Sequence, residues 1–279
     1  MAQRTWFITG VSGGLGRLMT EQLLARGERV AGTLRTPGAL DDLKAEHGSR
    51  LWLAQLDVTD TPAVRATVNR AFAELGRIDV VVNNAGYGVL GAAEEVTDAQ
   101  IDHQIATNLV GSIQVARGAI PHLRAQGGGR IIQISTMGGQ ATFPGGSLYH
   151  MSKWGIEGFM DAIRHELAPF GIAVTIVEPG STSTGFGKAL VIADPLEAYA
   201  ETPVGQIRAF FGSGTYKSPG DAPMVAAAIV ATADQPSPPL RLALGSDAYS
   251  AMHRALSERL AELEGQKDLA ASTDSKWLM

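Results

Sequence analysis

The chain has 279 residues, 45% of them hydrophobic, so it can bury a sizeable core, and its net charge of -5 without any basic run beside aromatic residues argues against nucleic acid as a partner. It has no cysteine, which excludes disulfides and thiolate metal sites, and its six histidines show no metal-ligand spacing. No stretch resembles a signal peptide and no apolar run reaches the ~18 residues of a membrane span, so we expect a cytoplasmic protein without a metal.

The first predicted unit is a strand, a glycine-rich turn and a helix. Residues 5–9 have the character of a buried strand, and residues 18–24 follow a helical period. The turn between them has the spacing Gly-x-x-x-Gly-x-Gly and consists of Gly10, Gly14 and Gly16, with Ser12 and Leu15 inside it. Such a turn sets the N–H groups of a helix N-terminus against a phosphate. Its spacing differs from the common Gly-x-Gly-x-x-Gly fingerprint, so a plain tight turn is the alternative.

The second predicted strand, residues 29–34, ends next to Arg35. In dinucleotide-binding folds an acidic residue about 20 positions past the glycines accepts the ribose 2′-hydroxyl, whereas an arginine accommodates a 2′-phosphate. The strand end holds no acid, and the nearest, Asp41 and Asp42, fall in the next helical stretch. We therefore predict NADP(H) over NAD(H), with Arg35 on the phosphate and Ser12 assisting. A solvated surface arginine is the alternative.

Two further buried strands, residues 51–56 and 78–82, precede short polar runs. These runs are Asp57 and Val58 after the first strand, and Asn83, Asn84, Ala85 and Gly86 after the second. Asp57 would cap the next helix. Residues 98–123 then predict one long helix with Asn108 inside it, although a mid-helix asparagine is usually neutral or mildly unfavourable.

Residues 130–153 carry the groups best suited to carbonyl chemistry. The apolar run at 130–134 predicts a strand buried on both faces, which delivers Thr136 to the sheet edge where open α/β sheets bind ligands. Tyr149 and Lys153 are four residues apart on the following helix, so their side chains share one face. A free tyrosine has a pKa of about 10, and a nearby ammonium favours its anion. A hydroxyl, a tunable phenol and a cation together suit proton transfer to or from an oxygen.

A Tyr-x-x-x-Lys pair alone occurs by chance in many helices. Here it accompanies Thr136 and an opening turn that matches a family motif through Thr9, Gly10, Gly14 and Gly16. On these motifs the sequence resembles the short-chain dehydrogenase/reductase family, from about residue 4 to about residue 264. The Gly-Thr-Leu-Arg run at 32–35 and the Gly-Gly turn after Thr136 look like the branch of 17β-hydroxysteroid and retinol reductases.

The resemblance implies four catalytic residues, Asn108, Thr136, Tyr149 and Lys153. Tyr149 would exchange a proton with the substrate oxygen that Thr136 polarises. Lys153 would hold the nicotinamide ribose and lower the Tyr149 pKa, and Asn108 would anchor a proton-relay water. The family most often has serine at the position of Thr136; threonine keeps the hydroxyl but adds a methyl and a stiffer χ1. Ser135 is the fallback for this role.

The resemblance also implies a wider set of cofactor contacts. Asp57 would hold the adenine ring, the run from Asn83 would line the cofactor and stabilise the sheet, and Thr184 would contact the nicotinamide carboxamide. The full set comprises Gly10, Ser12, Gly14, Leu15, Gly16, Arg35, Asp57, Val58, Asn83, Ala85, Gly86, Tyr149, Lys153, Pro179, Gly180 and Thr184.

The C-terminal part predicts strands at 172–177 and 240–244 and helices at 224–233 and 248–263. The segment 185–223 looks long and irregular, which is typical of a substrate-binding loop or lid. Its aromatic residues are Phe186, Tyr199, Phe210, Phe211 and Tyr216, and they suggest either an apolar substrate or the packing of short helices. We predict a single domain over 1–264 and a flexible tail over 265–279.

These features predict an α/β fold with a doubly wound, mainly parallel, seven-stranded sheet and helices on both faces. We expect an NADP(H)-dependent oxidoreductase that moves a hydride between the nicotinamide and a small ketone, aldehyde or secondary alcohol. A 3-oxoacyl thioester reductase and a non-catalytic NADP(H)-sensing protein are the rivals, with a sugar-nucleotide epimerase ranked lower. The family pairs the helices of Asn108 and Tyr149 across subunits, which implies a homodimer or homotetramer; packing inside a monomer explains the same pattern.

Overall fold

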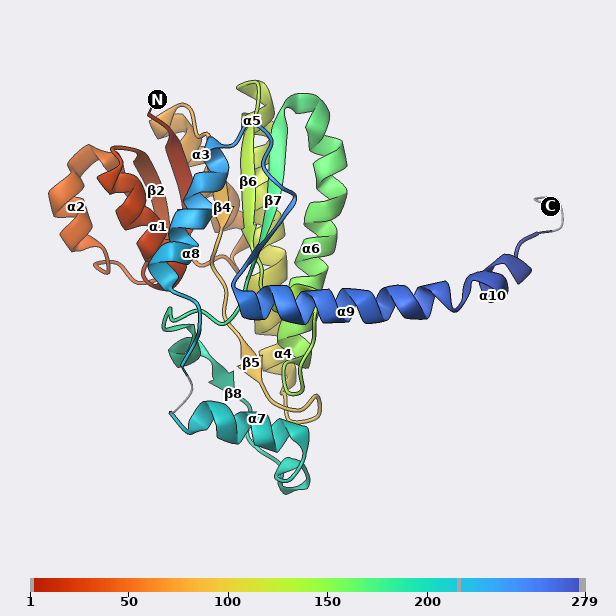
Figure 1. Cartoon of the computed structure of the whole chain (residues 1–279). Helices are drawn as coiled ribbons and strands as arrows, with labels where there is room; N and C mark the ends of the chain where they lie inside the picture. The colour runs from red at the N-terminus through yellow and green to blue at the C-terminus, as the bar shows by residue number, and fades with distance from the viewer. Residues whose placement is uncertain (1–2, 215–216, 276–279) are drawn as a thin grey trace.

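The computed structural model describes residues 3–214 and 217–275. In this part of the chain seven strands form one parallel sheet with helices on both faces (Figure 1). In spatial order they are β3 (Leu51–Gln55), β2 (Arg29–Leu34), β1 (Thr5–Thr9), β4 (Val80–Asn83), β6 (Gly129–Ile134), β7 (Ile172–Pro179) and β9 (Arg241–Leu244). The order reverses between β1 and β4, and open α/β sheets bind ligands at such a switch point, outside the carboxyl ends of the strands. The predicted fold class is confirmed.

Two layers of helices cover the sheet. One layer contains α3 (Thr61–Leu75), α5 (Ser112–Ala125) and α6 (Ser147–Leu167), and the other contains α1 (Gly14–Ala25), α2 (Asp41–His47) and α8 (Ala222–Ala231). Phe7 and Val81 pack into the first core, whereas Trp6 and Ile8 pack into the second. Successive strand residues face opposite sides, so a continuous apolar run fills both cores at once.

The helix predicted over 98–123 has a different form in the structure. It consists of α4 (Asp98–Gln104), a π-helical segment (Ile105–Gly111) and α5, which follow one another without a break. Thr97 opens α4 in a capping box with Gln100. Asn108 lies inside the π-helical segment, a local widening of the helix that is frequent at functional sites.

The segment 185–223 is more regular than its sequence predicts. It contains the 3-10 turns Phe186–Ala189 and Glu197–Tyr199, the strand β8 (Val191–Ile192) and the helix α7 (Pro203–Gly212). β8 pairs in parallel with β5 (Val89–Leu90), which follows β4. In Figure 1 these elements lie together below the sheet. The irregular reading is therefore wrong; Tyr216 lies outside the described residues.

The last two elements of the described residues are a long helix, α9 (Ser246–Glu264), and a short one, α10 (Lys267–Ser272). Composition predicts a flexible tail where α10 forms, and Trp277 and Leu278 of that tail lie outside the described residues. Figure 1 shows α9 crossing the molecule and α10 extending away from it. Among the helices of the described ranges, none combines the length and the apolar character needed to cross a bilayer.

Candidate active site

Backbone hydrogen bonds to β2 fix the start of the glycine turn at the end of β1. The N–H groups of Gly10 and Val11 both donate to the Thr33 carbonyl on β2, at 2.9 and 3.0 Å. Gly10 has a φ of 71° and Gly14 a φ of 55°, in the left-handed region that glycine adopts without strain. A Cβ at Gly16 would lie 2.3 Å from the Gly10 carbonyl oxygen, so only glycine allows this approach. No side chain caps the first turn of α1, which leaves its N–H groups available to a phosphate.

Thr9 and Asn84 fasten this turn to β4. The Thr9 hydroxyl accepts from the Asn84 N–H at 3.0 Å, and the Asn84 amide donates to the Thr9 and Gly10 carbonyls at 2.9 and 3.0 Å. The Asn83 amide is buried and donates instead to the Ser112 carbonyl at 3.0 Å. The side chain at the turn is therefore that of Asn84, which the predicted set omits, while the Asn83 side chain anchors α5.

Arg35 and Ser12 are exposed beside the same turn. The charge of Arg35 opposes the rise that burial produces in the pKa of Tyr87, and it also lowers the pKa of Asp57, so the guanidinium lies within electrostatic range of both side chains. Asp42 is engaged elsewhere, in an ion pair with Arg17. Arg35 and Ser12 are thus exposed to solvent, where an anionic group can reach them, and Asp42 does not compete for that position.

The loop after β3 differs from the predicted capping. Asp60, and not Asp57, caps α3 by accepting a backbone N–H at 2.9 Å. Asp57 accepts from the N–H and hydroxyl of Thr59 at 2.9 and 2.8 Å, which holds its pKa below the usual value. Val58 is buried and packs against Gly111. The capping prediction for Asp57 is wrong, and its carboxylate stays exposed at the C-terminal edge of the sheet.

Tyr149 and Thr136 meet beyond the C-terminal end of β6. Tyr149 lies in the first turn of α6, and its phenol shares a hydrogen bond with Thr136. The Thr136 hydroxyl also lies 3.3 Å from the Pro179 carbonyl oxygen. The neighbouring Ser135 is buried and donates to the Glu157 carboxylate at 2.5 Å. Of the two hydroxyls, that of Thr136 therefore faces Tyr149.

Lys153 and Asn108 lie side by side next to Tyr149. The Lys153 ammonium donates to the last carbonyl of β6 at 3.0 Å and lies 5.8 Å from the centroid of the Tyr149 ring. The Asn108 amide accepts from the Tyr87 N–H at 3.1 Å and donates to the Tyr87 carbonyl at 2.8 Å. A Cβ at Gly86 would be 3.1 Å from Asn108 Oδ1 and 3.8 Å from Lys153 Nζ. A side chain at position 86 would therefore contact both polar groups, and glycine leaves this space open between them.

The glycine turn and the Tyr149 site form one continuous region. A Cβ at Gly10 would touch the backbone of Ala85 at 3.0 Å, and Gly86, the next residue, borders Lys153. The predicted catalytic residues and the glycines of the turn thus lie together outside the carboxyl ends of β1, β4 and β6.

The loop after β7 closes this region from another side. A Cβ at Gly14 would lie 3.5 Å from the Thr184 carbonyl oxygen, so Thr184 borders the glycine turn. Its hydroxyl accepts from the Phe186 N–H at 3.3 Å. Pro179 is buried at the end of β7, and Gly180 packs against the first turn of α9 so closely that a Cβ has no room. Thr184 therefore borders the glycine turn, and Pro179, although its ring is packed into the fold, directs its carbonyl to the Thr136 hydroxyl at 3.3 Å.

Burial dominates the acid–base properties of Tyr149 and Lys153. It raises the pKa of Tyr149 above the usual value, and the hydrogen bond with Thr136 opposes this only in part. It lowers the pKa of Lys153 to about 8, against the charge of Glu157, which raises it. The sequence leads us to expect that Lys153 lowers the pKa of Tyr149. In the structure the net effect is the opposite, because burial raises this pKa by more than the surrounding groups lower it.

Glu157 connects Ser135 to a buried ion cluster that the sequence does not predict. Its carboxylate accepts from three side chains, those of Ser135, Gln140 and Arg241. Arg241 also donates to Glu178 at 2.7 Å, and burial together with the charge of Glu157 raises the pKa of Glu178 to about 7. The available sequence signal is the spacing of four residues between Lys153 and Glu157, which sets both on one helix face.

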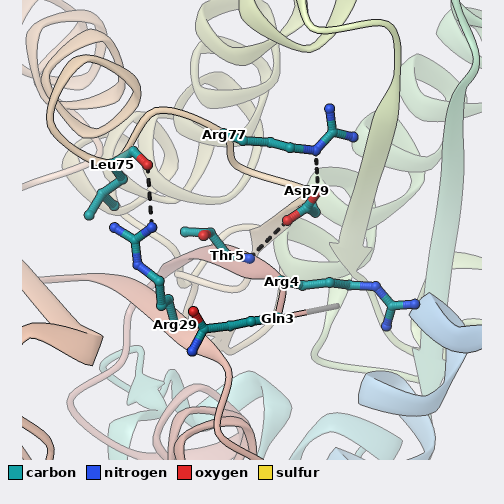
Figure 2. A pocket seen from close by; sticks show the side chains of 7 residues that line it. All are labelled: Gln3, Arg4, Thr5, Arg29, Leu75, Arg77 and Asp79. Atoms are coloured by element: carbon teal, nitrogen blue, oxygen red, sulfur yellow. Dashed lines mark hydrogen bonds and ion pairs between the residues drawn. The ribbon is translucent and has the colours of Figure 1, made fainter. Parts of the chain in front are cut away.

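A cavity of about 480 Å³ lies at the opposite edge of the sheet (Figure 2). Its lining residues are Gln3, Arg4, Thr5, Arg29, Leu75, Arg77 and Asp79. Figure 2 shows Asp79 bonded to both Arg77 and Thr5, where β1 begins. No predicted site residue lines this cavity. Across the described residues, no group of three or more His, Cys, Asp or Glu side chains is placed to hold a metal ion.

Comparison with known proteins identifies the family. The profile of the short chain dehydrogenase family matches residues 4–194. The chain belongs to this family. The chain is 34% identical to the oxidoreductase BOA17 of Botryotinia fuckeliana over 280 residues, 98% of this chain and 96% of that protein. It is 32% identical to retinol dehydrogenase 16 of Rattus norvegicus over 209 residues, 74% of this chain and 65% of that protein.

Solved structures of short-chain dehydrogenases share the fold. One from Streptomyces avermitilis is 38% identical, with a TM-score of 0.91, and the match covers 98% of this chain and 100% of that one. The closed form of a serine dehydrogenase complexed with NADP+ is 25% identical, with a TM-score of 0.74 over 86% of this chain and 94% of that one. The predicted family and enzyme class are confirmed: this short-chain dehydrogenase is an oxidoreductase.

Proposed function

We propose that this short-chain dehydrogenase uses NADP(H) to interconvert a ketone or aldehyde and the corresponding alcohol, on a substrate that is mostly apolar. The observation that carries the proposal is the junction at Gly86. There the glycine turn, through Gly10 and Ala85, borders Lys153, and Lys153 borders Tyr149. A dinucleotide held by the turn has its reactive end beside the one phenol that shares a hydrogen bond with Thr136.

The residues around the turn fit NADP(H). The uncapped start of α1 suits the pyrophosphate, and the missing Cβ atoms of Gly10, Gly14 and Gly16 allow it to approach. Exposed Arg35 and Ser12 suit a 2′-phosphate, which an acidic residue at the end of β2 would repel. The serine dehydrogenase with NADP+ bound, which shares the fold, supports the same choice.

The proton chemistry follows from burial. The bound nicotinamide supplies or accepts the hydride. Tyr149, with its pKa raised, stays protonated at neutral pH and donates its proton to the carbonyl oxygen in reduction. Thr136 donates a second hydrogen bond to that oxygen, and Lys153, whose pKa is about 8, holds the ribose as an ammonium ion and neutralises the phenolate that forms. Asn108 holds the Tyr87 backbone next to Gly86, which borders Lys153.

The segment 185–223 supplies an apolar wall and acts as the lid. The Phe186 ring lies 5.8 Å from the Tyr149 ring, centroid to centroid. Val191, Ile192 and Leu196, from the same segment, are between 37% and 46% exposed, which is high for large apolar side chains. The similarity to a retinol dehydrogenase supports an apolar substrate. The cytoplasmic location and the homo-oligomer remain predictions from the sequence.

The test is a screen of ketones, aldehydes, retinoids and hydroxysteroids that follows the absorbance of NADPH. We expect turnover of apolar carbonyls, and we expect Tyr149→Phe to lose ~10²- to 10⁴-fold in kcat, the usual contribution of general acid catalysis. The Kd for NADPH should stay within about threefold, because the hydroxyl is not among the groups proposed to bind the phosphates. Binding of NADPH without oxidation by any substrate would favour the sensor, and full activity of Tyr149→Phe on a confirmed substrate would refute the mechanism.

A further inference from the structure

The loop between β6 and α6, which carries the Thr136 hydroxyl, is folded around one buried side chain, that of His150. His150 follows Tyr149 in the first turn of α6 and is 3% exposed. Its Nδ1 lies 2.8 Å from the Gly138 carbonyl oxygen, and its Nε2 accepts from the Phe143 N–H at 3.2 Å. The Phe143 ring is inclined by 82° to the imidazole, with the two centroids 4.3 Å apart. One side chain thus holds the loop at two separate points.

Two glycines provide the room that the imidazole fills. A Cβ at Gly138 would lie 2.6 Å from Nδ1 of His150, and a Cβ at Gly146 would lie 2.6 Å from Nε2. These distances are shorter than atoms in a packed interior allow, so neither glycine can be replaced unless the ring or the loop moves. The backbone of the loop therefore approaches the imidazole closely beside both of its nitrogens.

The two hydrogen-bond partners determine the tautomer of His150. A carbonyl oxygen can only accept, so Nδ1 must carry the proton, and a backbone N–H can only donate, so Nε2 must lack one. Burial lowers the pKa of His150, which keeps the imidazole neutral at pH 7, as this arrangement requires. A charged ring would set a second N–H against that of Phe143.

The bond to Gly138 extends to the hydroxyl beside Tyr149. The Gly138 N–H donates to the Thr136 hydroxyl at 3.3 Å, while the carbonyl of the same residue accepts from His150. This carbonyl also accepts from the indole of Trp154 at 3.0 Å, but Trp154 is 40% exposed, so water can replace its indole as the donor. The helix α6 therefore carries the phenol directly and holds the hydroxyl through His150.

We propose that His150, as the neutral imidazole with its proton on Nδ1, is a positioning residue that fixes the Thr136 hydroxyl relative to the Tyr149 phenol. The proposal rests on the proposed carbonyl chemistry, in which both groups bind the same substrate oxygen. His150 acts through Gly138 and not on the substrate. Its loss should therefore lower kcat by the part of the Thr136 contribution that depends on exact placement, and leave the affinity for NADPH unchanged.

The first experiment determines the tautomer and needs no substrate. Nitrogen-15 NMR of the histidine rings in the wild-type chain, with His150→Gln used to assign the signals of His150, should show a protonated Nδ1 and an unprotonated Nε2 at pH 7. A protonated Nε2 would overturn the proposal, whether Nδ1 is protonated or not. The result does not depend on turnover, whereas a failure to reduce any carbonyl would refute the proposed function.

The second experiment separates the two bonds of His150 with variants that keep one bond each. Asparagine places its amide nitrogen at the position of Nδ1 and can still donate to Gly138, whereas glutamine places its oxygen near the position of Nε2 and can still accept from Phe143. Hydrogen exchange should leave the Gly138 N–H protected in His150→Asn and the Phe143 N–H protected in His150→Gln, with the other amide deprotected in each. Equal protection of the Gly138 N–H in the two variants would overturn the proposal.

The third experiment measures kcat on a substrate that the screen confirms. His150→Phe keeps a ring but makes neither bond, and it should lower kcat ~10- to 100-fold; His150→Gln should do the same, whereas His150→Asn should stay within about threefold of the wild type. Trp154→Phe is the matched control, because it removes the other donor to the Gly138 carbonyl, and its kcat should stay within about threefold. Equal losses in His150→Asn and His150→Gln, or in His150→Phe and Trp154→Phe, would contradict the proposal.

A double-mutant cycle with Thr136→Ala separates positioning from a general loss of packing. His150→Phe should lower kcat ~10-fold or more in the wild type but less than about twofold when residue 136 is alanine, because no hydroxyl is then left to place. A merely structural role would lower kcat equally in both backgrounds, and that result would overturn the proposal. The Kd for NADPH should stay within about threefold in every variant, since His150 acts on the hydroxyl and not on the cofactor. A loss of NADPH affinity that matches the loss of kcat would also overturn it.

Discussion

Replacing Glu157 with glutamine removes a buried negative charge one helical turn from Lys153 while keeping the size of the side chain. Glu157 is 1% exposed, and its negative charge raises the pKa of Lys153 and so opposes the lowering that burial causes. We expect the pKa of Lys153 to fall below its present value of about 8. The ammonium form predominates below that pKa and disappears as the pH rises through it, so the variant should lose the ammonium at a lower pH than the wild type does.

The magnitude follows from the two titration curves. With a pKa of about 8, roughly nine tenths of Lys153 is charged at pH 7. An opposite charge at close range shifts a pKa by about 1 to 3 units, and one unit corresponds to about 1.4 kcal/mol. If the pKa of Lys153 falls by about one unit in the variant, half of Lys153 is charged at pH 7 and about a tenth at pH 8. If the ammonium binds the ribose, the affinity for NADPH falls about twofold at pH 7 and about fivefold at pH 8.

The assay is the Kd for NADPH, measured by fluorescence between about pH 6 and pH 9. The midpoint of the alkaline loss of affinity should move down by about one pH unit in Glu157→Gln. Glu178→Gln is the matched control, because Glu178 belongs to the same ion cluster but does not contribute to the pKa of Lys153. Identical midpoints in wild type and in folded Glu157→Gln would refute the coupling between Glu157 and Lys153.

Three further outcomes are expected. Arg35→Ala should weaken NADPH binding ~10- to 100-fold, as expected for loss of a charged hydrogen bond, and leave NADH binding unchanged; equal wild-type preference for the two cofactors would contradict this. Thr136→Ala should lower kcat ~10²-fold and Ser135→Ala less than about threefold, and the reverse ranking would transfer the role to Ser135. Because the pKa of Glu178 is raised to about 7, the folded state holds this proton more tightly than the unfolded state, and the wild type should lose stability on the order of 2 kcal/mol as the pH rises from about 5 to 7. The melting temperature of Glu178→Gln should depend less on pH over the same range.

Much of the fold could be predicted because each central strand is recognisable from the apolar pattern of its own residues. β1 and β2 have the bounds that the pattern of apolar residues predicts, since a strand buried on both faces must be apolar throughout. The glycines of the turn could be found for a similar reason: positive φ at Gly10 and the close approach at Gly16 leave no alternative residue. These features depend on neighbours within a few positions, and a single sequence contains that information.

The features that could not be predicted depend on contacts between distant segments. β5 and β8 have two residues each and exist because they pair with each other, Val89 with Val191 and Leu90 with Ile192, across 101 intervening positions. The π-helical segment around Asn108 adds one residue to a turn without any proline or glycine run to mark it. Similarly, composition alone does not reveal that Lys267–Ser272 is helical, because this short segment has a single large apolar residue, Leu269, and buries none of its side chains.

The sequence alone does not decide which hydroxyl lies beside Tyr149, whereas the structure does. Ser135 and Thr136 are adjacent, both carry a hydroxyl, and spacing to Tyr149 separates them by a single position. What distinguishes them is Glu157, 22 positions after Ser135, whose buried carboxylate accepts a hydrogen bond from the Ser135 hydroxyl while Arg241 balances its charge. Removing that acceptor would free Ser135 to turn, so Glu157 both supports the charge of Lys153 and leaves Thr136 as the hydroxyl that faces the phenol. One carboxylate thus links the two properties on which the proposed proton transfer depends.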